Sequence, residues 1–330
     1  MVRKMAFRAR VYSISVVVGV GVGGWILGTF TERKRLLQIS DKFYDGTHET
    51  SSNFCFHKNF PALPLCGTVS AASPIENKVV VSQPSILPAS TRVSEIMRYG
   101  FPGLDNVRSF DDYVLSYDRR TRVPHWVFEH LTKDKLKYND AVDRSKCQFY
   151  EDESQHIFFR ALNTDYKGSG FDRGHMAAAG NHRLHQKHVE QTFVLSNMAP
   201  QVGRGFNRDA WNRLEKYVRK LTKKYVNVYV CTGPLYLPRK ESDGKTYVKY
   251  QVIGANTVAV PTHFFKVVVG EAEDRSLEME AYVMPNQVID DNTPLSVFQV
   301  PPESIERAAG LLFFDRVSRD KLSAVNGKKK

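Results

Sequence analysis

DRGH occupies residues 172–175 of this chain, and FNRDAWNRLE occupies residues 206–215. A neutral histidine can take a proton from water, which is the general-base step of a hydrolysis. An asparagine amide oxygen can hold a Mg²⁺ ion that keeps most of its own waters. His175 and Asn207 are therefore candidates for these two jobs, and together they predict metal-assisted hydrolysis of a phosphodiester.

The second motif begins the clearest helical pattern in the chain. Its apolar residues recur at steps of three and four: Trp211, Leu214, Val218, Leu221 and Tyr225. Asp209 is the expected N-cap, and the lysines at 223–224 suit the negative C-terminal end of the helix dipole. Asn207 would then lie at the start of the helix, with Glu215 about two turns further along.

Runs rich in β-branched and aromatic residues predict several strands, and a short helix is expected at 94–99. The expected strands cover residues 113–117, 125–130, 226–231, 247–253, 258–260, 264–269 and 280–284. A strand carrying His175, a further strand near Val194 and the helix at 211–225 would form a ββα unit. Strands with intervening helices indicate an α+β domain.

The ordered motifs resemble the signature of the DNA/RNA non-specific endonucleases of the ββα-metal class. SN at 196–197, FN at 206–207 and WNRLE at 211–215 follow DRGH in the order of that family. The similarity runs from Glu95 to about Phe314, roughly two thirds of the chain, and includes three further stretches: GSGF at 168–171, YQVIG at 250–254 and VPTHFFK at 260–266. The resemblance implies a ββα-metal nuclease fold, with a mixed sheet and flanking helices.

The same resemblance implies an activity, a cofactor, an oligomeric state and a cellular location. It implies an endonuclease that hydrolyses phosphodiester bonds of DNA and RNA with low sequence specificity. The expected cofactor is Mg²⁺, with Mn²⁺ as a substitute. It also implies a homodimer, a mitochondrial location, and a role in DNA degradation during apoptosis.

Each candidate residue is given a role, and some keep a structural alternative. The expected catalytic residues are the base His175, the charge-stabilising arginines and two orienting groups: His175, Arg173, Arg160, Asn197 and Glu215. Asn207 is the expected metal ligand, and the expected substrate-binding residues are Arg204, Arg208 and Lys216. The alternatives are a helix-start cap for Asn207, a loop cap for Asn197 and an exposed ion pair with Arg219 for Glu215. Asp172 is expected to orient a site residue that the sequence does not identify.

Net charge gives weak support for a polyanionic partner, because most of it lies at the ends. The formal charge is +12, of which residues 1–35 carry +6 and the three C-terminal lysines +3. The other 292 residues therefore carry only +3. Local clustering is stronger, with eight basic residues against two acids from Gln201 to Lys224. A solvated helix face is the alternative interpretation of that cluster.

The first 90 residues divide into two segments with different compositions. Residues 1–35 hold four early basic residues and an uncharged stretch from Val11 to Phe30, which predicts mitochondrial targeting and a membrane anchor. A secretory signal is the competing interpretation. Residues 36–90 are rich in Pro, Ser and Thr and predict a linker, which leaves 91–330 as the nuclease domain. The N-terminal segment is expected to contact the mitochondrial membrane or import machinery, in the intermembrane space or on the inner membrane. Release to the nucleus is a further expectation.

The four cysteines are too scattered for a zinc site, and their disulfide state stays open. Cys231 lies in a strand-like run and is expected to be a small core residue.

Two rival functions remain at this stage. One is a catalytically silent nucleic-acid-binding protein on the same fold. The other is a membrane-tethered interaction protein that uses its linker and basic tail. The complete set of His175, Asn207 and Glu215 favours the enzyme.

Overall fold

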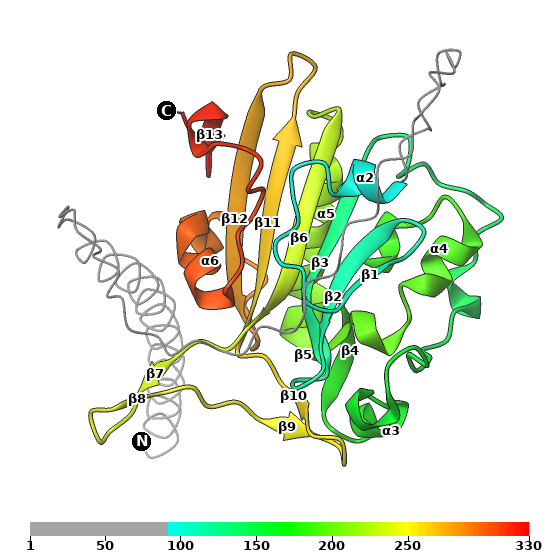
Figure 1. Cartoon of the computed structure of the whole chain (residues 1–330), viewed down its shortest axis with the longest axis vertical. Helices are drawn as coiled ribbons and strands as arrows, with labels where there is room; N and C mark the ends of the chain where they lie inside the picture. The colour runs from blue at the N-terminus through cyan, green and yellow to red at the C-terminus, as the bar shows by residue number, and fades with distance from the viewer. Residues whose placement is uncertain (1–91, 330) are drawn as a thin grey trace, which may run out of the picture.

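The computed structural model describes residues 92–329, and a mixed sheet runs through the middle of this region (Figure 1). Its strand order is β1-β2-β3-β6-β11-β12-β13-β14. The strands are β1 (Val107–Ser109), β2 (Tyr113–Asp118), β3 (Val123–Leu131), β6 (Asn227–Leu235), β11 (His263–Glu271), β12 (Leu277–Pro285), β13 (Leu322–Val325) and β14 (Lys328–Lys329). Neighbours pair antiparallel except β12 and β13, which pair parallel. The expected α+β class with a mixed sheet is confirmed.

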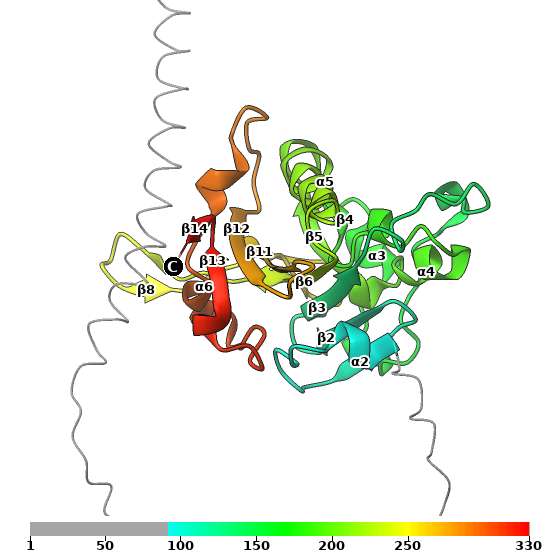
Figure 2. The ribbon, with the colours of Figure 1, turned by 90° about the horizontal axis from the view of Figure 1, so that it is seen from above.

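Both faces of the sheet are covered, because its central strands are apolar on both sides. In β11, Phe264 and Val268 belong to one hydrophobic cluster, while Phe265 and Val267 belong to the other. This is the period-two alternation of a strand with two buried faces. Helix α5 (Asn212–Leu221) covers the first face, and α2 (Arg92–Ile96) and α6 (Pro302–Ala309) cover the second. Figure 2 shows α5 and α2 on opposite sides of the sheet.

A ββα unit lies on the α5 side. Strands β4 (Phe171–His175) and β5 (Met198–Val202) pair antiparallel, with His175 opposite Met198. The helical segment η5 (Gly203–Trp211) follows β5 directly and continues into α5. The unit is confirmed, but the second strand does not lie near Val194, which forms only an isolated bridge with Tyr150. Short helices α3 (Asn163–Tyr166) and α4 (Gln186–Gln191) flank the unit.

The expected N-cap was wrong. Arg204 and Gly205 have non-helical backbone angles, and the continuous helix begins after them, so Asp209 lies inside the helix rather than at its start. Its carboxylate still accepts a hydrogen bond from a backbone N–H, that of Gly205 at 2.5 Å. Gly205 has a φ of +85°, a conformation that suits glycine and bends the chain into the helix.

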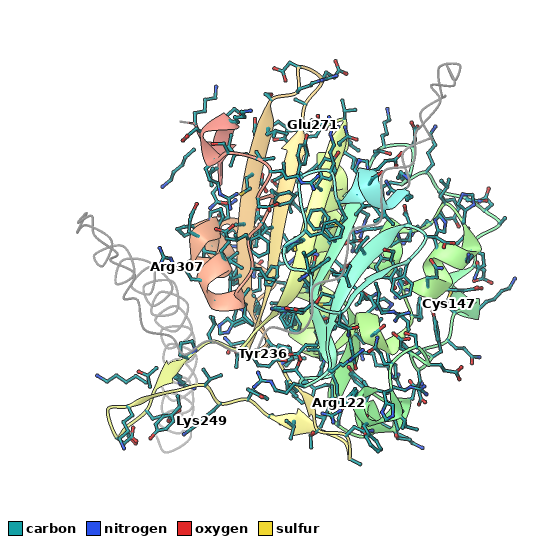
Figure 3. All side chains as sticks on the ribbon, in the orientation of Figure 1. Arg122, Cys147, Tyr236, Lys249, Glu271 and Arg307 are labelled. Atoms are coloured by element: carbon teal, nitrogen blue, oxygen red, sulfur yellow. The ribbon has the colours of Figure 1, made fainter. Side chains whose placement is uncertain are left out.

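The expected strand at 247–253 was also wrong as a single element. The segment splits between two small ladders, one of β7 (Arg239–Lys240) with β8 (Thr246–Tyr247) and one of β9 (Val252–Ile253) with β10 (Val258–Ala259). The pairing partners lie on two different turns, so no continuous strand can form. The ladder of β7 and β8 makes an arm that reaches away from the sheet, and Lys249 lies along it, far from Glu271 (Figure 3).

Two further expectations concern the core and the chain ends. Cys231 is fully buried in β6, as expected, and Cys147 is half-buried, both as free thiols. Within residues 92–329, no helix is long and apolar enough to cross a membrane. The predicted targeting segment and linker lie outside the described residues.

Candidate active site

A cavity of about 500 Å³ opens between the ββα unit and the loop that holds residues 144–149. Five of the nine candidate residues line it: Arg173, His175, Asn207, Arg208 and Glu215. Four do not: Arg160, Asn197, Arg204 and Lys216. The polar lining and the mixture of a histidine, an amide, a carboxylate and arginines suit a charged, hydrated substrate rather than an apolar ligand.

His175 ends β4 and sits among aromatic rings. Its ring lies 4.8 Å from that of Phe193, edge to face, and 5.6 Å from that of Phe149. Its Nε2 is buried and has no hydrogen-bond partner among the described residues. Burial, aided by the charge of Arg144, lowers the pKa of His175 to about 3. The imidazole is therefore neutral at physiological pH, with a nitrogen lone pair uncommitted to the protein.

Asp172 orients Asn207, which answers a question that the sequence left open. The Asn207 Nδ2 donates to Asp172 Oδ2 at 2.9 Å. A carboxylate only accepts, so the amide nitrogen must face Asp172, and Oδ1 is left for a ligand in the cavity. Arg208 donates to both oxygens of Asp172, at 2.7 and 2.8 Å, and this contact holds the pKa of the carboxyl below its usual value.

Glu215 lies on α5, about two turns after Asn207 as expected. Its carboxylate makes no hydrogen bond or ion pair within the described region, so the expected alternative of a direct pair with Arg219 is not seen. Burial raises the pKa of Glu215, although the charges of Lys266 and Arg219 oppose this. Lys266 is fully buried and donates to Thr232 Oγ1 at 2.6 Å, so a positive charge lies beneath the helix.

Two arginines flank the histidine. The Arg173 guanidinium carbon lies 4.8 Å from the ring centroid of Phe149 and 5.8 Å from that of Tyr166, distances at which a cation is attracted to both rings. Arg144 lines the same cavity and an adjoining hollow of about 270 Å³. No sequence motif indicates Arg144, because it begins a short 3-10 helix (Arg144–Lys146) that lies 31 residues before His175.

The four residues outside the cavity have other contacts. Asn197 is buried, and its amide bonds both backbone groups of Ala177, at 2.9 and 3.1 Å, and the carbonyl of Thr192. These bonds hold the backbone two residues after His175 in place. Asn197 therefore caps a loop and, through that loop, helps to position His175. Arg160 donates to the backbone carbonyls of Gln155 and Glu153. Arg204 is exposed at the start of the helical segment, and Lys216 is exposed in the middle of α5.

The donor groups in the cavity fit a hydrated, oxygen-seeking cation. No group of three or more His, Cys, Asp or Glu residues in the described region could enclose a metal ion. What the cavity offers is one oriented amide oxygen and one carboxylate without a partner. Mg²⁺ keeps several waters and needs few protein ligands, so this sparse set suits it better than Zn²⁺, which takes His and Cys ligands.

Comparison with known proteins fits this geometry. Residues 92–320 match the family described as DNA/RNA non-specific endonuclease. The chain belongs to the DNA/RNA non-specific endonuclease family. It is therefore an endonuclease that acts on DNA and RNA, and the predicted family, fold and enzyme class are confirmed.

Individual relatives are similar over most of the chain. Mitochondrial endonuclease G of Caenorhabditis elegans is 52% identical over 278 residues, which cover 81% of this chain and 90% of that protein. Mitochondrial endonuclease G of Homo sapiens is 58% identical over 223 residues, covering 68% of this chain and 74% of that protein. A solved structure of an EndoG/EndoGI complex, which describes EndoG inhibition, contains a chain that is 73% identical. Its TM-score is 0.73, and the match covers 74% of this chain and 99% of that one.

Proposed function

We propose that this endonuclease hydrolyses phosphodiester bonds with one Mg²⁺ ion, for which Mn²⁺ can substitute, and with His175 as the general base. The observation that carries the proposal is the pairing in one cavity of a neutral, unpartnered imidazole nitrogen with an asparagine oxygen freed by Asp172. Both arrangements leave a polar atom that is not committed to another protein group.

The reaction divides between the two groups. His175 takes a proton from water as the water oxygen attacks phosphorus, and the bond from phosphorus to the departing ribose oxygen breaks. A bound Mg²⁺ would neutralise charge on the phosphate and on the departing oxygen. Asn207 would hold the ion through Oδ1, and Glu215 would accept hydrogen bonds from waters that complete its shell.

The arginines supply charge without reading bases. Arg173 and Arg144 line the cavity and would stabilise the added negative charge of the transition state. Arg204, Arg208 and Lys216 are exposed around the helical segment and would bind phosphates along the strand. Contacts to phosphates position a nucleic acid but carry no sequence information, which agrees with low sequence specificity.

Location and assembly are part of the proposal. The mitochondrial names of the relatives support a mitochondrial location, with the intermembrane space or inner membrane as the proposed compartment. We also propose a homodimer, because the arm near β8 exposes apolar side chains: Tyr247, Val248, Tyr250 and Val252. A monomer mass in sedimentation velocity would remove that proposal. DNA degradation in apoptosis, after release to the nucleus, is the proposed physiological role.

Plasmid nicking tests the chemistry. Purified full-length protein with Mg²⁺ should nick a supercoiled plasmid, and EDTA should stop it. His175→Ala should lose about 10²–10⁴-fold in rate, the usual contribution of a general base. His185→Ala, at an exposed histidine outside the cavity, is the matched control and should keep full activity. Near-normal cleavage by a folded His175→Ala would show the base to be misassigned, and binding without cleavage by the parent would favour a silent nucleic-acid-binding protein.

A further inference from the structure

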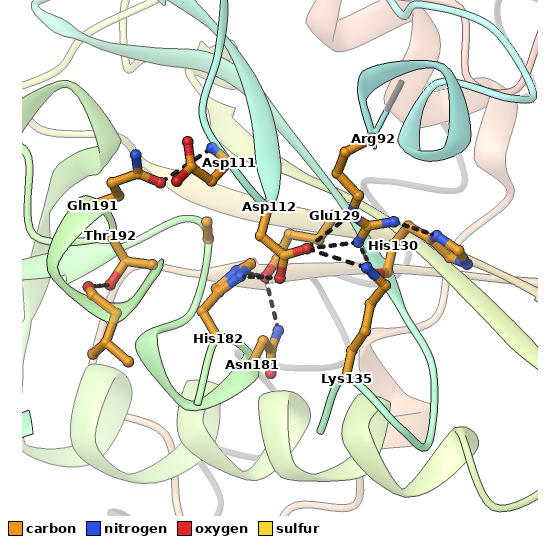
Figure 4. Close-up of polar contacts among 12 residues, drawn as sticks. Arg92, Asp111, Asp112, Glu129, His130, Lys135, Asn181, His182, Gln191 and Thr192 are labelled. Atoms are coloured by element: carbon orange, nitrogen blue, oxygen red, sulfur yellow. Dashed lines mark hydrogen bonds and ion pairs between the residues drawn. The ribbon is translucent and has the colours of Figure 1, made fainter. Parts of the chain in front are cut away.

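A second histidine lies buried outside the active-site cavity. His182 is 1% exposed, and each ring nitrogen meets a carboxylate oxygen (Figure 4). Nδ1 lies 2.9 Å from Asp112 Oδ2, and Nε2 lies 3.0 Å from Glu129 Oε1. Ionised carboxylates only accept, so both ring nitrogens must donate, and the ring is an imidazolium.

The surroundings of His182 keep this charge balanced. Asp112 precedes β2 and is also paired with Arg92 at 2.8 Å and with Lys135 at 3.6 Å. Burial alone would lower the pKa of His182, but its hydrogen bonds to Asp112 and Glu129 outweigh burial and raise the pKa to about 9. The ring of Tyr113 packs against His182, and the imidazolium also faces His188 on α4 and the cavity residue His175, whose pKa its charge lowers. Lys266 on β11 and Arg219 on α5 interact with Glu129 on its other side.

A chain of hydrogen bonds joins His182 and its carboxylates to α5, the helix that carries Glu215. Glu129 Oε1, which contacts His182, also accepts from Asn181 Nδ2 at 2.9 Å. The Asn181 amide therefore presents Oδ1 on its other side, where Arg219 Nη1 donates to it at 2.9 Å. Both Glu129 and Asn181 are buried, so neither can find a replacement partner in water.

Arg219 stands at the wall of the active site. Gly180 lines the cavity, and a Cβ atom built on it would lie 3.1 Å from Arg219 Nη1. The Arg219 guanidinium therefore packs directly against the backbone of Gly180. Arg219 also lies one helical turn after Glu215, and its charge opposes the effect of burial on the pKa of Glu215. Movement of Arg219 would therefore change the packing behind Gly180 and would let the pKa of Glu215 rise further.

We infer that the His182 imidazolium is a positioning residue of this endonuclease, acting through Glu129, Asn181 and Arg219 on the Gly180 wall and on Glu215. His182 itself does not line the cavity and touches no reacting atom. Without its charge, Glu129 would be a buried carboxylate short of a partner, and the bond that orients Asn181 would be disturbed. The inference rests on the active site proposed above.

The geometry has a consequence at alkaline pH. Loss of the His182 proton leaves one ring nitrogen without a hydrogen to donate, so one of the two carboxylates loses its bond. Because the pKa of His182 is raised to about 9, the positive charge that balances Glu129 is present at neutral pH and is lost as the pH rises through that value. The rate constant kcat should therefore fall on the alkaline side with a midpoint near this pKa.

Two variants of the full-length protein test the inference. His182→Gln removes the charge, and Asn181→Leu leaves His182 and both carboxylates in place but cuts the link to Arg219. In each variant, kcat at pH 7.5 should fall by about 10–100-fold, which is the usual loss when a residue that orients active-site groups is removed. KM should change by less than about threefold, because no substrate contact is removed. The alkaline fall of kcat near pH 9 should be absent from both.

The matched control is His185→Gln, an exposed histidine three residues away, which should keep the parent's kcat and its pH profile. A folded His182→Gln with the parent's kcat and an unchanged alkaline limb would overturn the inference. If His182→Gln does not fold, a parent-like kcat in Asn181→Leu overturns it instead. Failure here leaves the proposed function intact, because that function depends on the separate result with His175→Ala.

Discussion

At the scale of single residues, His175 and Asn207 share a cavity but depend on different neighbours. Aromatic rings and burial keep His175 neutral. The Asp172 carboxylate accepts a hydrogen bond from Asn207 Nδ2, which leaves Asn207 Oδ1 facing the cavity. The two side chains should therefore fail in different ways when changed.

Asn207→Ala should bind Mg²⁺ more weakly, because the proposed ligand atom Oδ1 is removed. A higher Mg²⁺ concentration should therefore recover part of its nicking rate. Asp172→Ala should behave similarly but more mildly, because Asn207 keeps its oxygen and loses only its orientation. Loss of such a supporting contact costs about 10–100-fold in metal affinity or activity. Nicking rates across a Mg²⁺ titration measure both effects. Recovery of His175→Ala by Mg²⁺ to the same extent would contradict the separation of roles.

The pH dependence of His175 has a definite sign. The base works in its neutral form, and burial lowers its pKa to about 3, so kcat/KM should show no acid limb at the ordinary imidazole pKa of roughly 6.5. A bound phosphate is an anion and favours the protonated ring, so the acid limb of kcat should lie at a higher pH than that of kcat/KM. In steady-state rates from pH 4.5 to 8, kcat/KM should therefore show no midpoint, whereas kcat should begin to fall at the acid end of that range. A kcat/KM midpoint between pH 6 and 7 would contradict this environment for His175.

At the scale of elements, the glycine of DRGH is explained by the pairing of β4 with β5. A Cβ atom at Gly174 would lie 2.0 Å from Gln201 Oε1 and 2.4 Å from its Cγ. Gln201 is fully buried, so its side chain cannot swing out to make room. Close approach of two strands, rather than a special backbone angle, requires glycine directly before His175.

Gly174→Ala should therefore destabilise the fold by about 1–3 kcal/mol, the usual cost of overpacking a core. Urea unfolding measures the free energy, and nicking rates should fall as His175 is displaced. Gly174→Ala combined with Gln201→Ala should recover part of the lost stability, because the second change makes space. A single Gly174→Ala variant as stable as the parent would show that the strands can separate without cost.

At the scale of the whole molecule, the net charge is distributed unevenly along the sequence. Of the net charge of +12, the first 35 residues carry +6, and they lie outside the described nuclease region. The proposed catalytic cavity lies in the described region, in the ββα unit on one face of the sheet.

A reporter fused to residues 1–50 should enter mitochondria, as a basic, acid-free start before an apolar stretch predicts. The control fusion replaces the four basic residues before Val11 with glutamine and should lose mitochondrial location. Fluorescence microscopy with a mitochondrial marker measures both. Entry of the unaltered fusion into the secretory pathway would support the competing signal.

The sequence by itself determined the family, the ββα unit and five of the residues around the cavity, because these lie in short motifs whose spacing is local. It also predicted most central strands, since their β-branched and aromatic runs are continuous. Only the tertiary structure decided that Asp172 orients Asn207, that Arg144 joins the site, and that Arg160, Arg204 and Lys216 lie outside the cavity. Asp172 and Asn207 are 35 positions apart in the sequence, and Arg144 and His175 are 31 apart. No local sequence pattern records which side chains at such separations will lie together. The buried chain from Asp112 through His182 to Arg219 is of the same kind, because its members come from the turn before β2, from β3, from a loop and from α5, which only folding brings together.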